Sequence, residues 1–187
     1  MDNITGVINF IKEIEGLKSV TRTSWTKEGR RESTAEHSWR LAMLLMLLEE
    51  DFKDVDINKA IKMSLVHDLG ELYDGDISAL IQEDNNVKAN MEQKAMDRML
   101  KVLPENISHT VYDLWKEYND CSTKEAKLVK AMDKLETIVQ HNQGSNPDDF
   151  NYEFNLQYGK QYFKDDDRLM KMRNIIDEDT KESIKIK

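Results

Sequence analysis

The sequence predicts an all-α protein that folds as a single helical bundle. Apolar residues recur at helical spacing along almost the whole chain, as at Val7, Ile8 and Ile11, and no run of alternating β-branched residues competes with them. The 187 residues include only two prolines and seven glycines, which leaves few positions that would interrupt a helix. A chain of this length can form one sizeable core.

The helix boundaries follow from the apolar spacing and from residues that cap helix ends. Capping boxes are indicated by Ser33 with Glu36 and by Ser122 with Glu125, and Asp56 can cap a third helix. Helices are therefore expected near residues 4–19, 34–52, 57–70, 86–102, 105–118, 123–142, 150–163 and 165–177.

The loop at 144–149 is the clearest break in the chain. The roughly 40 residues after it are too few for an independent domain, so they are expected to join the same body as a pair of helices. We expect one domain over residues 1–179, followed by a frayed tail at 180–187.

Composition and charge exclude several classes of partner. Charged residues make up 34% of the chain and the formal net charge is -9, so an extended nucleic acid is not expected to bind. The longest apolar run, residues 41–48, is far shorter than the roughly 20 residues that span a bilayer, and the N-terminus lacks the features of a signal peptide. The single cysteine, Cys121, permits no intrachain disulfide, which favours the cytoplasm.

Ligand-type residues occur in three segments that lie on different predicted helices. These segments are AEHSW around His37, LVHDLGE around His67 and Asp68, and KAMDKLE around Asp133. Each polar residue has apolar neighbours and so is expected to face inward. A buried carboxylate such as Asp133 needs a cation or a hydrogen-bond donor. Two imidazoles and two carboxylates would suit one divalent ion (Mn, Co, Fe, Ni or Zn) and would leave coordination positions open for water or substrate.

Each of these residues also has a simpler interpretation. His37 could be an ordinary core histidine, and Asp133 could pair with Lys130 or Lys134. Asp74 and Asp76 could shape a turn around Gly75. A single bound ion would explain the set together.

On these residues the sequence resembles the HD-domain metal-dependent phosphohydrolases, whose H…HD…D signature is matched by His37, His67-Asp68 and Asp133. The additional Glu71, the Gly75-Asp76 pair and the upstream Arg22 resemble the bacterial 5'-deoxynucleotidase and oxetanocin-like branch. The resemblance covers roughly residues 8–175 in the order of its segments. It implies an all-helical HD domain and a homodimer.

The resemblance also implies roles for individual residues. The metal ligands would be His37, His67, Asp68 and Asp133. Glu71 and Asp76 would be catalytic carboxylates, and Arg22 would contact the phosphate. In the family a tryptophan that shapes the sugar pocket directly follows that arginine, whereas here Thr23 follows it and the candidate is Trp25.

Local chemistry agrees with these roles. Glu71 follows His67 by four residues and Asp68 by three, so the three would share one side of the helix if it continued for a further turn. Residues 18–31 contain five basic residues and a single acidic one, which could hold a phosphate or could form a solvated basic loop.

The sequence therefore predicts hydrolysis of (deoxy)ribonucleoside 5'-monophosphates by one divalent metal. A pyrophosphohydrolase acting on a nucleoside triphosphate or an alarmone is the first alternative, although no further basic cluster for a longer phosphate chain is evident. A catalytically silent metal-binding interaction module is the second. The remaining histidines, His109 and His141, are expected at the surface or at helix ends rather than in a second metal site.

Overall fold

The computed structural model describes residues 3–76 and 85–186. The described chain is mostly helical, with one small two-stranded sheet, so the all-α prediction is confirmed. The α-helices are α1 (Asn3–Ile14), α2 (Thr34–Leu47), α3 (Ile57–Val66), α4 (Asn85–Met99), α5 (Glu105–Asp120), α6 (Lys124–Gln143) and α7 (Asp167–Ile186). Short 3-10 helices are η1 (Glu15–Lys18), η2 (Leu69–Glu71), η3 (Leu100–Val102), η4 (Tyr152–Leu156) and η5 (Lys160–Tyr162).

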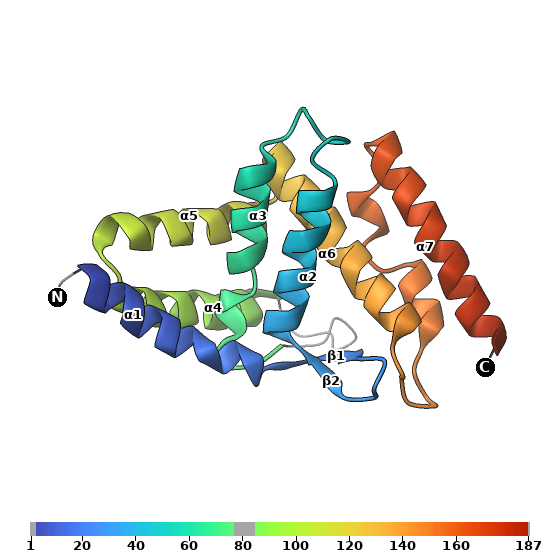
Figure 1. Ribbon diagram of the computed structural model, residues 1–187, viewed down its shortest axis with the longest axis horizontal. Coiled ribbons are helices and arrows are strands. Elements are labelled where there is room, and N and C mark those ends of the chain that lie inside the picture. Colours follow the sequence, from blue (N-terminus) through green and yellow to red (C-terminus); the bar gives the residue numbers. More distant parts are fainter. Residues whose placement is uncertain (1–2, 77–84, 187) are drawn as a thin grey trace.

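Two hydrophobic clusters divide the interior (Figure 1). The first lies between α2, α3, α6 and α7 and contains Leu41, Met63 and Met132. The second lies between α1, α4 and α5 and contains Phe10 and Met96, with Leu69 of η2. The segment that links α3 to η2 therefore runs from one cluster to the other, and it carries the HD dipeptide.

Side-chain caps begin the central helices. Ser33 and Glu36 form the expected capping box at α2, and the carboxylate of Asp56 accepts a hydrogen bond from the backbone N–H of Lys59 in α3. The expected Ser122 cap of α6 is wrong by one residue, since Thr123 accepts the bond from the Ala126 N–H at 3.1 Å.

Two expected helices are shorter than predicted and a third is absent. Helix α2 ends at Leu47 rather than near 52, and α3 ends at Val66 rather than near 70. The predicted helix at 150–163 is wrong: η4 and η5 occupy this segment, with Gly159 between them at a φ of 67°. A positive φ interrupts an α-helix, and glycine adopts it without steric cost.

The expected frayed tail at 180–187 is wrong as far as residue 186, because α7 continues to Ile186. Thr180 is fully buried, and its hydroxyl accepts a hydrogen bond from the Asn142 side chain at 2.9 Å. This contact holds the last turns of α7 against α6.

A small hairpin was also not expected from the sequence. Strands β1 (Thr21–Trp25) and β2 (Arg31–Ser33) pair antiparallel, and the turn between them contains Gly29 at a φ of 83°. The hairpin carries Arg22 and Trp25.

No helix in the described part of the chain is both long and apolar enough to cross a membrane.

Candidate metal centre

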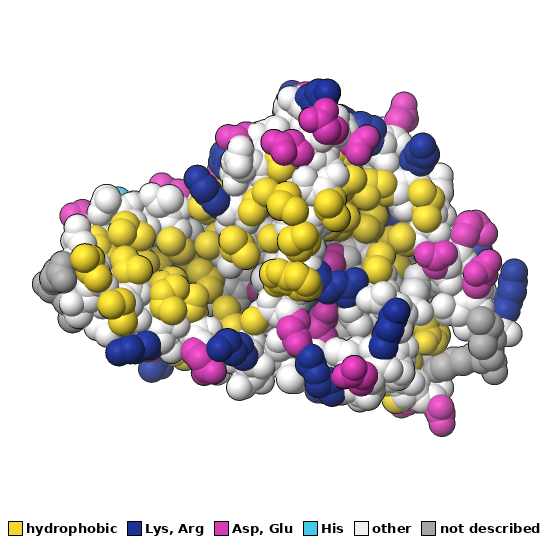
Figure 2. All heavy atoms as spheres, in the orientation of Figure 1, with side chains coloured by type: hydrophobic (Ala, Val, Ile, Leu, Met, Phe, Trp, Pro, Cys, Tyr) yellow, Lys and Arg dark blue, Asp and Glu magenta, His cyan; other side chains and the backbone are white. Residues whose placement is uncertain are grey.

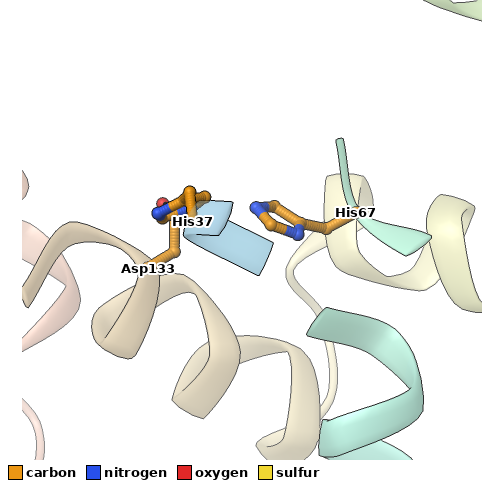
Figure 3. A group of neighbouring side chains, drawn as sticks. All are labelled: His37, His67 and Asp133. Atoms are coloured by element: carbon orange, nitrogen blue, oxygen red, sulfur yellow. The ribbon is translucent and has the colours of Figure 1, made fainter. Parts of the chain in front are cut away.

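His37, His67 and Asp133 come together from three separate elements (Figure 3). His37 lies in the first turn of α2, His67 directly follows α3, and Asp133 lies near the middle of α6. The Nε2 atom of His37 is 3.2 Å from Oδ1 of Asp133, and one ligand atom from each of the three residues lies within 4.8 Å of the others. All three side chains are buried.

Asp68 completes this group because the chain leaves the α-helix at Val66. Its Oδ2 atom lies 3.1 Å from Nε2 of His67 and 3.9 Å from Nε2 of His37. In a continuing α-helix, adjacent residues would point about 100° apart around the axis. The turn lets both side chains of the dipeptide face the same point.

The free nitrogen atoms of the two histidines fit a cation. The Nδ1 atom of His67 bonds to the Ser64 carbonyl oxygen at 2.7 Å, and Nδ1 of His37 bonds to the carboxylate of Glu136. Neither Nε2 atom makes a hydrogen bond with any residue that the structure describes, although both are buried. An imidazole whose Nδ1 is held in this way directs Nε2 toward a metal, so this donor set suits a divalent ion.

The charges of these residues also favour a cation. Burial and Arg22 favour the neutral imidazole of His37, but Glu136 and Asp133 outweigh them and raise its pKa to about 10. Burial alone would raise the pKa of Asp133, yet Lys134 and His37 hold it well below its usual range. A proton on His37 thus occupies a position where a metal would bind, and metal binding would release it.

Two residues that support the centre were not expected from the sequence, namely Glu136 and Tyr118. Lys134 was considered only as an alternative to metal binding by Asp133, but it also supports the centre. The Tyr118 hydroxyl donates to Oδ2 of Asp133 at 2.5 Å, and the Lys134 ammonium donates to the same oxygen at 2.9 Å. The pairing of Asp133 with Lys134 thus exists together with its approach to His37. Lys130, the other partner considered for Asp133, makes no ion pair with a described residue.

Arg22 reaches the edge of this centre from β1. Its guanidinium donates to the Thr137 hydroxyl at 2.9 Å and lies 3.4 Å from Oδ2 of Asp68 and 3.5 Å from Oε2 of Glu32. The group is buried. Trp25, on the same strand, is half-buried and packs edge-on against Phe150 with ring centroids 5.9 Å apart.

Glu71 lies in η2 rather than on a further turn of α3, because its N–H bonds back to the Asp68 carbonyl at 3.1 Å. Its side chain is buried, and burial together with Asp68 and Asp76 raises its pKa to about 10. The Lys88 ammonium lies 3.7 Å from Oε1 of Glu71. Asp76 follows a turn at Gly75, whose φ is 86°.

A cleft of about 1560 Å³ opens beside the centre. Its lining includes the candidates Arg22, Trp25, His67, Asp68, Glu71, Asp76 and Asp133, while His37 lies behind them.

His109 is exposed, as expected. His141 lies in the last turn of α6, also as expected, but it is buried, and its Nδ1 bonds to the Asn155 side chain at 2.8 Å.

Comparison with known proteins gives the family. A profile of the HD domain matches residues 14–173. The chain belongs to the HD-domain family. Similar proteins include 5'-deoxynucleotidase HDDC2 of Dictyostelium discoideum, which is 38% identical over 145 residues (73% of this chain and 76% of that protein). The human protein of the same name is 34% identical over 136 residues (72% of this chain and 66% of that protein).

A solved structure has a similar fold over almost the whole chain. A predicted metal-dependent phosphohydrolase from Magnetospirillum magnetotacticum superposes with a TM-score of 0.79 at 25% identity, and the match covers 99% of this chain and 97% of that one. The H…HD…D residues predicted from the sequence therefore lie in an HD domain, and the structure brings them together beside its cleft.

Proposed function

We propose that this HD-domain protein is a 5'-nucleotidase that uses a divalent metal to hydrolyse (deoxy)ribonucleoside 5'-monophosphates to nucleoside and phosphate. The observation that carries this proposal is the pair of buried Nε2 atoms, on His37 and His67, that face two carboxylates without hydrogen-bond partners of their own. The relatives named 5'-deoxynucleotidases support the choice of substrate.

His37, His67, Asp68 and Asp133 would hold one transition-metal ion per chain. Such an ion lowers the pKa of water and polarises a phosphoryl oxygen. The buried guanidinium of Arg22 lies beside Asp68, where it can bind the phosphate oxygens and offset their charge.

The two further carboxylates would handle protons. Burial and the nearby Asp68 and Asp76 raise the pKa of Glu71 in the metal-free protein, where the acid therefore holds its proton. A bound metal ion would lower this pKa, and the ionised carboxylate could then accept the proton of the attacking water. Asp76 lines the same cleft and would assist this step or protonate the leaving 5'-oxygen.

The test is a panel of nucleotides assayed with metal-stripped protein that is reconstituted with one ion at a time. We expect orthophosphate and nucleoside from 5'-monophosphates in the presence of at least one transition metal. Pyrophosphate from a triphosphate or an alarmone would instead support the pyrophosphohydrolase. Metal binding without turnover of any substrate would support a silent interaction module.

We further propose that Trp25 lines the sugar subsite. It contributes to the cleft wall on the same strand as Arg22 and contacts Phe150 from the C-terminal part of the chain. Trp25→Ala should narrow any preference for deoxyribose over ribose and leave a generic phosphate ester little affected. An unchanged sugar ratio in a folded variant would contradict this role.

We also propose that the chain forms a homodimer through an apolar face. Val7, Ile8 and Ile11 form an exposed stripe on α1, and Trp39 and Leu47 on α2 are 62% and 71% exposed. Figure 2 shows hydrophobic side chains gathered across the part of the surface that covers these helices. Exposed apolar patches of this kind mark interaction sites. Leu47→Glu should convert a dimer to a monomer in sedimentation experiments.

The cytoplasmic location expected from the single cysteine stays a prediction.

A further inference from the structure

One face of α6 forms a wall of the cleft along most of its length. Residues at helical spacing contribute to this wall, namely Lys130, Asp133, Lys134, Thr137 and His141. At about 1.5 Å per residue, Lys130 lies about 4.5 Å before Asp133 along the axis and Thr137 about 6 Å after it. Because Thr137 holds the Arg22 guanidinium, Lys130 and Arg22 lie on opposite sides of Asp133.

Lys130 differs from the other cationic side chains that line the cleft. Arg22 pairs with Asp68, Lys88 with Glu71 and Glu92, Lys116 with Asp120, and Lys134 with Asp133. The ammonium of Lys130 makes neither an ion pair nor a hydrogen bond with any residue in the ranges 3–76 and 85–186, although its side chain is half-buried. A partly buried charge without a partner is costly unless a ligand supplies the counter-charge.

Tyr118 places this ammonium close to the metal centre. The Lys130 Nζ atom lies 3.6 Å from the centroid of the Tyr118 ring. The same ring contacts His67, with centroids 4.9 Å apart, and its hydroxyl donates to Asp133. A cation–π contact fixes the position of the ammonium and leaves its charge available. Burial, followed by the charge of Lys134, lowers the pKa of Lys130 to about 8, and the charges of Asp133 and Asp68 only partly offset this.

We propose that Lys130 binds a non-bridging oxygen of the 5'-phosphate, from the side of the metal centre opposite Arg22. A phosphate monoester has three such oxygens, and a metal and Arg22 account for two of them. A lysine supplies a compact point charge for the third. This inference rests on the proposed nucleotidase function, and it makes the phosphate subsite a clamp with a residue from α6 on one side and one from β1 on the other.

Lys130→Met removes the charge and keeps an unbranched side chain, and Lys130→Arg keeps the charge. Lys127→Met is the matched control, since Lys127 is exposed on the same helix and its loss changes the net charge equally. The Kd of inorganic phosphate for the metal-loaded proteins would be measured by calorimetry, together with kcat/KM for a 5'-monophosphate. Metal content and Tm of each variant would be measured as well.

We expect Lys130→Met to weaken phosphate binding and kcat/KM by about 10- to 150-fold, the usual effect of losing a charge-assisted contact. Lys130→Arg should recover part of this loss, and Lys127→Met should match the wild type. Metal content should be equal in all four proteins.

An unchanged Kd for phosphate in folded Lys130→Met would overturn the proposal. The proposal would also be overturned if Lys130→Met weakened the binding of nucleoside di- or triphosphates but not that of orthophosphate, because the lysine would then contact a more distant phosphate. If the wild type hydrolyses 5'-monophosphates and Lys130→Met does so equally well, only the role of Lys130 fails. If the metal-loaded wild type neither binds phosphate nor hydrolyses any nucleotide, the proposed function fails with it.

Discussion

Glu136 bonds to the Nδ1 atom of His37 behind the candidate metal centre, although 99 residues separate the two in the chain. The other oxygen of Glu136 lies 3.2 Å from the guanidinium of Arg40, one helical turn beyond His37 in α2. The carboxylate is therefore fixed between two residues of α2, and the imidazole it holds can present only its Nε2 atom to Asp133. This arrangement links α2 to α6 through the site itself.

Glu136→Ala should weaken metal binding by about 10- to 100-fold, as losses of the partner of a metal-bound histidine usually do. The reason is that His37 would be free to rotate and to change its protonated nitrogen. Titration of the metal-stripped protein with the ion would measure this change. Glu28→Ala, at an exposed position in the hairpin turn, is the control. Equal affinities in all three proteins would contradict a positioning role for Glu136.

Tyr118→Phe should weaken metal binding while leaving the ring contacts with His67 and Lys130 in place. The Tyr118 hydroxyl stays protonated in the wild type because burial and then Asp133 raise its pKa well above the usual value. It therefore donates steadily to Asp133, and removing this bond to a charged group should cost roughly 1.5 to 3 kcal/mol of metal binding at most. Calorimetric titration with the ion measures the loss, and unaltered binding would assign Tyr118 to packing alone.

The parts of the fold that the sequence predicts well depend on local interactions. Helix α6 was expected because its apolar residues recur every three or four positions, and α2 because Ser33 and Glu36 cap each other within one turn. The ligand set was predicted because inward-facing histidines and aspartates need a partner wherever they are buried. The HD-domain family, predicted from the same residues, is confirmed.

The features of the fold and of the site that the sequence does not predict depend on contacts between distant segments. The sequence contains Glu136 three residues after Asp133, but its bond to His37 exists only once α2 packs on α6. The α3 helix ends at Val66 because Leu69 packs into the second hydrophobic cluster, and local periodicity contains no sign of this change of direction. Likewise, Thr180 stays helical through its contact with Asn142. Its place near the C-terminus therefore did not predict whether this segment is helical or frayed.

Arg22→Ala should lower kcat/KM for a 5'-monophosphate by about 10- to 150-fold, the range for a lost charge-assisted contact. Metal content should not fall, because removing a cation beside Asp68 leaves that carboxylate more available to the ion. Arg22→Lys should recover only part of the rate, since an ammonium lacks the fork of the guanidinium. Steady-state kinetics would decide, and unchanged constants for Arg22→Ala would remove the phosphate contact.

Glu71→Gln should bind the metal normally but lose most turnover, by roughly 10²- to 10⁴-fold, which is typical for the loss of a general base. The amide has nearly the same shape as the carboxylic acid but cannot accept a proton from water. Turnover must be compared at equal metal content. Near-normal activity in the metal-replete variant would move the role of base to Asp76.

Glu71 should also make the stability of the metal-free protein depend on pH. Burial is the main cause that raises its pKa to about 10 in the folded state, followed by Asp68 and Asp76, whereas the unfolded value is about 4.3. Between these two values the folded state binds the proton and the unfolded state does not. The contribution of Glu71 to the free energy of unfolding is therefore fully present below about pH 4 and declines as the pH rises toward 10.

The Glu71→Gln variant tests the direction of this pH dependence, because glutamine resembles the protonated acid at every pH. Metal-stripped variant and wild type should be about equally stable near pH 4 in urea unfolding. The variant should then become progressively more stable than the wild type at pH 5, 7 and 9, since the wild type alone must hold a proton that its unfolded chain releases. A difference in stability that stays constant over this range, or that grows toward low pH, would show that Glu71 is ionised in the folded metal-free protein.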